Sequence, residues 1–182
     1  MTVSSEALDE QMLVIRSQMG DESAFRELLE LYGSPLLLFT QRMMRNWPEE
    51  VPDVVQEVWI AIYRGLPRLR EVSRFRSWAF RIARDRIYRE YRRRKSPVQS
   101  LDEATLANVP GAEELGSGFD REELDRCLGS ISPEHREVLV LRFFEEMSYE
   151  DIARVTGSNV GTVRSRLHYA KHAVQELWKG KT

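Results

Sequence analysis

The chain has 182 residues, of which 42% are hydrophobic and 31% are charged, and its formal net charge is −2. This composition is typical of a folded protein and excludes both a disordered chain and a general polyanion binder. No apolar run approaches the roughly 20 residues that span a bilayer, and the polar, acidic N-terminus does not resemble a secretory signal. A single cysteine, Cys127, excludes an internal disulfide, which fits a reducing cytoplasm. Together these features lead us to expect a cytoplasmic protein without membrane insertion.

Charge is distributed unevenly along the chain. Residues 68–95 contain eleven arginines and one lysine against three acids, a net charge of +9, whereas residues 98–120 contain five acids and no Lys or Arg. From residue 159 onward, five basic residues stand against one acid. Two basic regions that flank an acidic one favour two contacts with a polyanion, joined by a segment that avoids it.

The first helices are predicted from capping residues and apolar spacing. Asp21 is the expected N-cap of one helix, and Pro35 is expected in the first turn of the next, where proline is tolerated. The inward residues of these two helices would be Phe25, Leu28, Leu29, Tyr32, Leu36, Phe39 and Met43.

Two further helices complete the N-terminal half. One begins at Asp53 and ends near Pro67, with an apolar stripe formed by Val55, Val58, Trp59, Ile62 and Leu66. The other covers residues 74–94, and its expected inward residues are Phe75, Trp78, Ala79, Ile82 and Ile87.

Residues 98–120 contain prolines and glycines and lack any sustained apolar period, which predicts a flexible acidic linker. Helices resume at residues 121–128 and, after the start signal Ser132-Pro133, at residues 134–144. No stretch of the sequence alternates apolar and polar residues over the length of a typical β-strand. The predicted fold is therefore all-α, with two small helical domains, 1–97 and 121–182, joined by the linker.

The C-terminal domain ends in a helix-turn-helix pattern. A short helix containing Ile152 is followed by Gly157, which can adopt a left-handed turn, and then by a second helix with Val163 as its apolar anchor. The second helix of this motif lies in the major groove, where all four base pairs can be distinguished. Its period turns Val163, Leu167, Ala170, Val174 and Leu177 inward and places Arg164, Ser165, His168 and Tyr169 on the opposite side.

Four segments in this order resemble the extracytoplasmic-function (ECF) sigma factors of the sigma-70 family. They are Asp-Glu-Ser-Ala-Phe at 21–25, Asp-Val-Val-Gln-Glu-Val-Trp at 53–59, Phe-Arg-Ser-Trp-Ala-Phe-Arg-Ile-Ala at 75–83 and Gly-Thr-Val-Arg-Ser-Arg at 161–166. The resemblance implies a protein that is not an enzyme, binds core RNA polymerase and directs it to promoter DNA. Its region 2 domain, 1–97, would recognise and melt the −10 element, and its region 4 domain, 121–182, would read the −35 element. An anti-sigma factor is a further expected partner.

The helix that begins at Asp53 is the expected polymerase-binding element. Opposite its apolar stripe it carries Asp53, Gln56, Glu57 and Ile60, a mixed polar surface with one aliphatic side chain, which suits docking on another protein. The resemblance implies that the partner surface is the clamp coiled coil of the polymerase β′ subunit, and we also expect a contact with the β flap.

The basic helix at residues 74–94 is expected to bind and melt the −10 element of the promoter. Aromatic rings interleaved with cationic side chains suit single-stranded nucleic acid, because stacking on a ring is worth roughly 1–3 kcal/mol per base. The expected residues are Arg74, Arg76, Trp78, Arg81, Arg84, Tyr88 and Tyr91. Trp78 also lies in register with Phe75 and Ile82, so a position in the core is the competing interpretation.

The second helix of the helix-turn-helix carries the expected −35 residues. Arg164 suits a two-pronged contact with guanine, whereas Arg166 and Lys171 suit phosphates. The full set is Thr162, Arg164, Ser165, Arg166, His168, Tyr169 and Lys171. Two residues depart from the family pattern, Asp85 where many relatives carry Asn and Tyr169 where many carry Arg, so we assign no promoter sequence.

Two other protein classes account for less of the sequence. An ordinary helix-turn-helix regulator would account for residues 121–182 but would leave the Asp53 helix and the basic helix unexplained. A small metal-dependent nuclease would need a metal site, and His168 and His172 alone, four residues apart, do not supply one. We therefore expect no metal, no cofactor and no catalytic residue.

Overall fold

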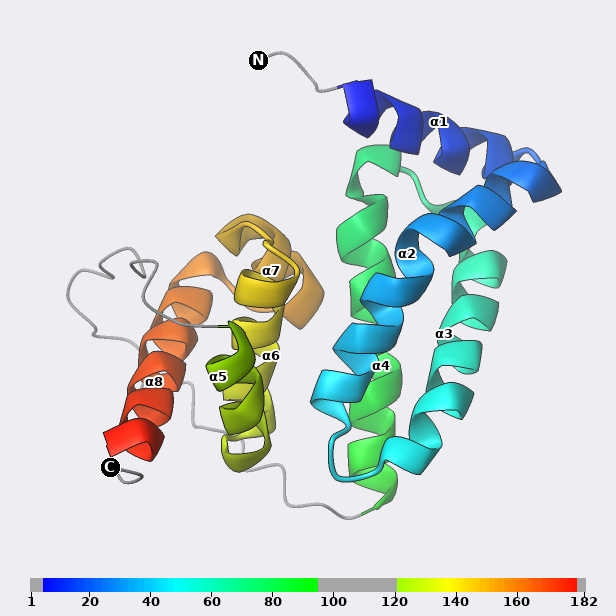
Figure 1. Cartoon of the computed structure of the whole chain (residues 1–182). Helices are drawn as coiled ribbons and strands as arrows, with labels where there is room; N and C mark the ends of the chain where they lie inside the picture. Colours follow the sequence, from blue (N-terminus) through cyan, green and yellow to red (C-terminus); the bar gives the residue numbers. More distant parts are fainter. Residues whose placement is uncertain (1–4, 95–120, 180–182) are drawn as a thin grey trace.

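The computed structural model describes residues 5–94 and 121–179, and within these ranges every regular element is a helix or a helical turn (Figure 1). The predicted all-α fold is thus confirmed for the described residues, whereas the predicted linker, 98–120, lies outside them. The α-helices are α1 (Ser5–Gln18), α2 (Glu22–Met43), α3 (Val51–Gly65), α4 (Phe75–Arg93), α5 (Arg121–Cys127), α6 (Pro133–Leu139), α7 (Tyr149–Thr156) and α8 (Val160–Lys179). A π-helical turn, Val140–Phe144, extends α6.

Short polar side chains begin several of these helices. The carboxylate of Asp21 accepts hydrogen bonds from the backbone N–H groups of Ser23 (2.9 Å) and Ala24 (3.1 Å), which confirms it as the N-cap of α2. Ser132 caps α6 by accepting from the N–H of His135, with Pro133 in the first turn. These local bonds satisfy amide donors that have no partner inside the helix.

The prediction that Pro35 begins a new helix is wrong. α2 continues through Pro35 from Glu22 to Met43 as one helix. Proline removes one backbone donor, but the inward stripe on both sides of it stays fully packed, and this packing holds the helix together. The stripe consists of Ala24, Leu28, Tyr32, Leu36, Phe39 and Met43.

The helices form two groups that pack against each other (Figure 1). α1–α4 form one group and α5–α8 the other, and contacts between them join α4 to α7 and α2 to α6. One cluster of buried apolar side chains runs through both groups, from Val14 on α1 to Val174 on α8. None of the described helices is long and apolar enough to cross a membrane.

Candidate nucleic-acid and polymerase interfaces

The helix-turn-helix forms as its sequence predicts. Ser148 caps α7 through the N–H of Asp151, and Gly157 ends α7 in the left-handed conformation at φ 69°. Few residues other than glycine adopt that conformation without strain. After the turn, the side chain of Asn159 accepts a hydrogen bond from the N–H of Thr162 (2.7 Å) at the start of α8, so Asn159 caps this helix.

α8 presents a polar face beyond the turn. The side chains of Arg164, His168 and Tyr169 are exposed, as predicted. The guanidinium carbon of Arg164 lies 5.9 Å from the ring centre of Tyr149 on α7, and the rings of His168 and Tyr169 lie 5.5 Å apart. This face therefore combines one cation with two hydrogen-bonding rings on a single exposed helix surface.

Ser165 does not share this exposed face, contrary to the prediction. It is 5% exposed, and its hydroxyl donates to the carbonyl of Gly161 (2.8 Å). The reason is that α5, α6 and α7 all contact α8, so the covered arc of this helix is wider than its apolar stripe alone.

Arg166 is half-buried, and its positive charge adds to burial in lowering the pKa of His135 on α6. Thr162 and Lys171 are also half-buried.

The seven residues predicted on and before α4 divide into three sets. Arg74, Arg76 and Arg81 are exposed, and Arg74 forms an ion pair with Glu71 at 2.7 Å. Trp78 is half-buried against Phe75, with ring centres 5.9 Å apart. The remaining three, Arg84, Tyr88 and Tyr91, face the protein interior.

The two tyrosines of α4 are buried. Tyr91 is 2% exposed and donates to the carbonyl of Met43, and burial raises its pKa to about 12. The hydroxyl of Tyr88 donates to the carboxylate of Glu137 on α6 (3.2 Å), and burial raises its pKa as well. Arg84 donates to the other oxygen of Glu137 at 2.7 Å. In this arrangement none of the three groups faces solvent as a free partner for a nucleic acid.

The predicted polymerase-binding residues lie together on the outer face of α3. Asp53, Gln56, Glu57 and Ile60 are all exposed. Glu57 also bridges to α4, where it pairs with Arg89 and, at 3.8 Å, with Arg86. Sequence reasoning missed Tyr63, which is 63% exposed and stands one turn beyond Ile60. Its place outside the apolar stripe of α3 was the signal that could have identified it.

Sequence reasoning also missed the charged residues that join the two helical groups. They are Arg42, Arg45, Asp125, Arg136, Glu137 and Glu145. Local periodicity carries no signal for such pairs, because their members lie far apart in sequence. Across residues 5–94 and 121–179, no three His, Cys, Asp or Glu side chains gather as a metal-binding group.

Known protein families match both helical groups. The Sigma-70 region 2 family model matches residues 28–96, and the Sigma-70, region 4 model matches residues 121–174. The chain is 32% identical over 185 residues to the ECF RNA polymerase sigma-E factor of Haemophilus influenzae, a match that covers 94% of this chain and 96% of the relative. It is 33% identical over 182 residues to the corresponding factor of Escherichia coli K12, with 93% and 94% covered.

Two solved structures resemble the chain over most of its length. The sigma factor RpoE of Bartonella quintana, solved with the anti-sigma factor NepR, gives a TM-score of 0.66 at 26% identity and covers 85% of this chain and 96% of its own. CnrH, solved with the cytosolic domain of CnrY, gives a TM-score of 0.70 at 24% identity, with 96% and 99% covered, and is similar in fold.

Proposed function

Because the chain belongs to the ECF sigma factors of the sigma-70 family, it directs transcription initiation by RNA polymerase and is not an enzyme, and we propose that three surfaces divide this work. α8 would read duplex DNA, α3 would bind the polymerase, and the basic α4 would contact the separated strand. The domains that carry these surfaces would be residues 1–97 and 121–182, as the sequence predicts.

The exposed face of α8 carries the proposal most directly. Arg164, His168 and Tyr169 project from the helix that follows the left-handed turn at Gly157. A helix in this position enters the major groove, where arginine binds guanine through two hydrogen bonds. The −35 element is the expected target, and Lys171 and Arg166 would add phosphate contacts.

The outer face of α3 suits the polymerase. Asp53, Gln56 and Glu57 form a polar surface beside the exposed aliphatic side chain of Ile60, and Tyr63 extends this surface by one exposed ring. Apolar and aromatic side chains at the middle of a polar rim are typical of protein interfaces. Its partner would be the clamp coiled coil of β′, while the region 4 domain would contact the β flap.

The basic α4 would hold the −10 strand. Arg81 and Arg92 are exposed on this helix, and Arg74 and Arg76 lie at its N-terminal end. Such cations track a nucleic-acid backbone. Arg84 and Tyr88 would join them only after they separate from Glu137.

An anti-sigma factor would regulate the chain. The support is RpoE of Bartonella quintana, which resembles this chain and was solved with the anti-sigma factor NepR. The partner of this chain would bind by covering surfaces that the polymerase or the promoter needs.

Run-off transcription tests the whole assignment. Core RNA polymerase is incubated with a genomic fragment library, with and without the purified chain. Defined start sites that depend on the chain are expected. A chain that fails to associate with core enzyme, yet protects a duplex operator by itself, would instead be an ordinary helix-turn-helix regulator.

A further inference from the structure

One aromatic ring at the start of α7 contacts two arginines. The guanidinium carbon of Arg142, on the π-helical turn, lies 5.3 Å from the ring centre of Tyr149, and that of Arg164, on α8, lies 5.9 Å from it. A guanidinium at such a distance is attracted by the negative face of the ring. Tyr149 is half-buried, so this attraction acts where water is partly excluded. The ring is therefore shared between a turn and the proposed DNA-reading helix.

The two arginines are held to different degrees. Arg142 is half-buried, and its Nη1 donates to the backbone carbonyl of Met147 at 2.9 Å. Arg164 is exposed, and within the described part of the chain its guanidinium makes no hydrogen bond or ion pair. Its contact with Tyr149 uses the face of the ring, so the N–H groups at the edge of the guanidinium stay available to a base.

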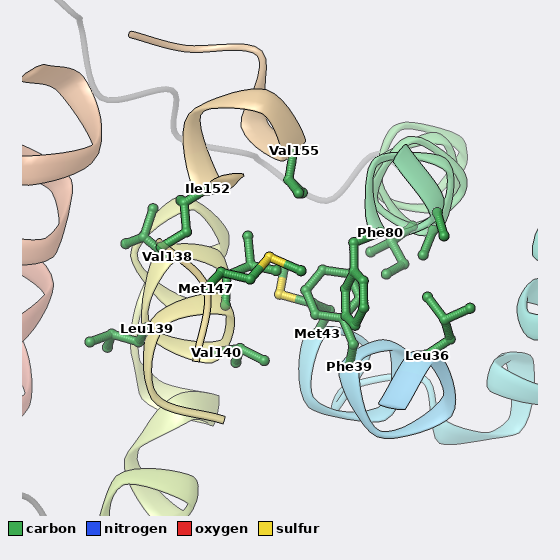
Figure 2. Close-up of a cluster of buried hydrophobic side chains, with 14 of the residues drawn as sticks. Leu36, Phe39, Met43, Phe80, Val138, Leu139, Val140, Met147, Ile152 and Val155 are labelled. Atoms are coloured by element: carbon green, nitrogen blue, oxygen red, sulfur yellow. The ribbon is translucent and has the colours of Figure 1, made fainter. Parts of the chain in front are cut away.

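The backbone that carries Tyr149 is fixed on both sides. Figure 2 shows Met147 and Ile152 directed into the cluster of buried apolar side chains, and each is at most 2% exposed. The hydroxyl of Ser148 accepts from the N–H of Asp151 (3.1 Å) and donates to its carboxylate (2.6 Å), which fixes the first turn of α7. The ring of Tyr149 packs against the same cluster. It is thus a rigid support for any flexible side chain that touches it.

The start of α8 is fixed as well. Val163, directly before Arg164, is 0% exposed, and Leu167, one turn further along, is 1% exposed. These two anchors turn position 164 outward near the end of α8 that follows the Gly157 turn. The flexible part is then the arginine side chain alone, whose length gives it many rotamers.

Restricting these rotamers favours discrimination between bases. A free arginine could turn away from a wrong base and bind a phosphate instead. An arginine held against a ring leaves its donors facing the wrong base without partners, which is unfavourable. Arg142 strengthens the restriction, because it already occupies the carbonyl of Met147 and its like charge opposes movement of Arg164 toward that side.

We propose that Tyr149 is a positioning residue for −35 recognition, whose ring holds the guanidinium of Arg164 in the orientation that reads one base pair. The inference rests on the proposed role of α8 in reading the −35 element. It adds a residue outside the reading helix to those that determine promoter choice. Arg142 completes the arrangement from the π-helical turn.

The test measures base preference in the polymerase holoenzyme with the full chain. Two templates compete for transcription from a start site that run-off transcription identifies, one with the original −35 element and one with a single base pair changed. Arg164→Ala first identifies the base pair at which discrimination depends on Arg164. Tyr149→Leu removes the ring but keeps an apolar side chain. It should lower discrimination at that base pair about fivefold and leave the other −35 positions unchanged.

Three further chains separate positioning from simple packing. Tyr149→Phe keeps the ring and should retain discrimination within about twofold of the unmodified chain. Phe144→Leu removes another half-buried ring, one that contacts Arg42 at 4.0 Å, and should leave every −35 preference unchanged. In the Arg164→Ala background, Tyr149→Leu should cause no further loss, because the ring acts only through Arg164. An equal loss at all −35 positions, or a further loss in the double variant, would overturn the positioning role.

A fluorinated ring guards against a Tyr149→Leu chain that does not fold. Trifluorophenylalanine at position 149 keeps the shape of phenylalanine and weakens the negative face on which the guanidinium contact depends. Discrimination at the base pair assigned to Arg164 should fall below that of Tyr149→Phe. Equal discrimination by these two chains would mean that the ring acts by packing alone, and the proposal would fail.

Failure of the inference and failure of the proposed function give different results. If Arg164→Ala alters preference at one base pair and Tyr149→Leu does not, only the positioning role fails. If Arg164→Ala alters preference at no base pair while start sites still depend on the chain, the reading role of Arg164 fails and the positioning role with it. Absence of chain-dependent start sites would contradict the proposed function itself, and with it the positioning role.

Discussion

The indole ring of Trp78 packs directly against the backbone of Gly65, at the point where α3 ends beside α4. A β-carbon at Gly65 would lie 2.9 Å from Cζ2 of Trp78, closer than such atoms normally approach. The Gly65→Ala variant should therefore lose about 1–3 kcal/mol of unfolding free energy, because the half-buried indole must shift against the core side chains on which it packs. Urea denaturation followed by circular dichroism measures this loss.

Gly33→Ala is the matched control for this substitution. Gly33 lies inside α2, and an added β-carbon there would meet no atom within 4 Å. Since alanine favours a helix over glycine, this variant should gain up to about 1 kcal/mol. Equal effects at the two glycines would show that contact with Trp78 does not restrict Gly65.

Asp21 makes stability depend on pH in the acid range. Hydrogen bonds from Ser23 and Ala24, and the charge of Arg16, hold the pKa of Asp21 far below its usual value. A depressed folded-state pKa means that the native chain binds fewer protons than the unfolded chain. The stabilisation is fully present above the unfolded pKa of about 4 and is lost as pH falls below it.

The Asp21→Asn variant isolates this contribution, because asparagine still caps a helix but carries no charge. The melting temperature of the unmodified chain should exceed that of Asp21→Asn at neutral pH, and the difference should shrink as pH falls from about 5 toward 2. Glu27→Gln removes an exposed carboxylate elsewhere on α2 and should show no comparable trend. A difference that stays constant down to pH 2 would contradict the assignment.

Arg164 should determine sequence choice in the −35 element. Arg164→Ala is expected to lose about 1–3 kcal/mol of discrimination at one base pair, while binding to core polymerase stays intact. Transcription from a set of −35 point variants measures this loss. Arg126→Ala removes the same charge from the exposed side of α5 and should leave base preference unchanged. Loss of core binding by Arg164→Ala would count against the division of roles.

The apolar centre of the α3 surface should be needed for polymerase binding. Ile60 is 42% exposed, so Ile60→Asp should keep the fold while placing a charge at the middle of the interface. Affinity for core polymerase, measured by fluorescence anisotropy with the labelled chain, should fall at least tenfold, or about 1.4 kcal/mol. Met19→Asp makes the same kind of change at the end of α1 and should bind normally. Unchanged binding by Ile60→Asp would place the interface elsewhere.

Local sequence patterns were sufficient to identify the family, the helical fold and the helix-turn-helix. The caps at Asp21 and Ser132 and the turn at Gly157 depend on residues within one helical turn, so they can be read without any partner helix. The exposure of Arg164 and His168 follows in the same way, from the period of one amphipathic helix. For these features, tertiary packing agreed with local preference.

Packing between distant segments decided the remaining features. α2 stays continuous through Pro35 because its apolar stripe is buried both before and after this residue. Ser165 is buried because α5, α6 and α7 all pack against α8. Tyr88 faces inward because Glu137, 49 residues away, completes a buried polar group with it. Periodicity reports which side of a helix is apolar, but only the assembled chain determines which polar side chains meet across an interface.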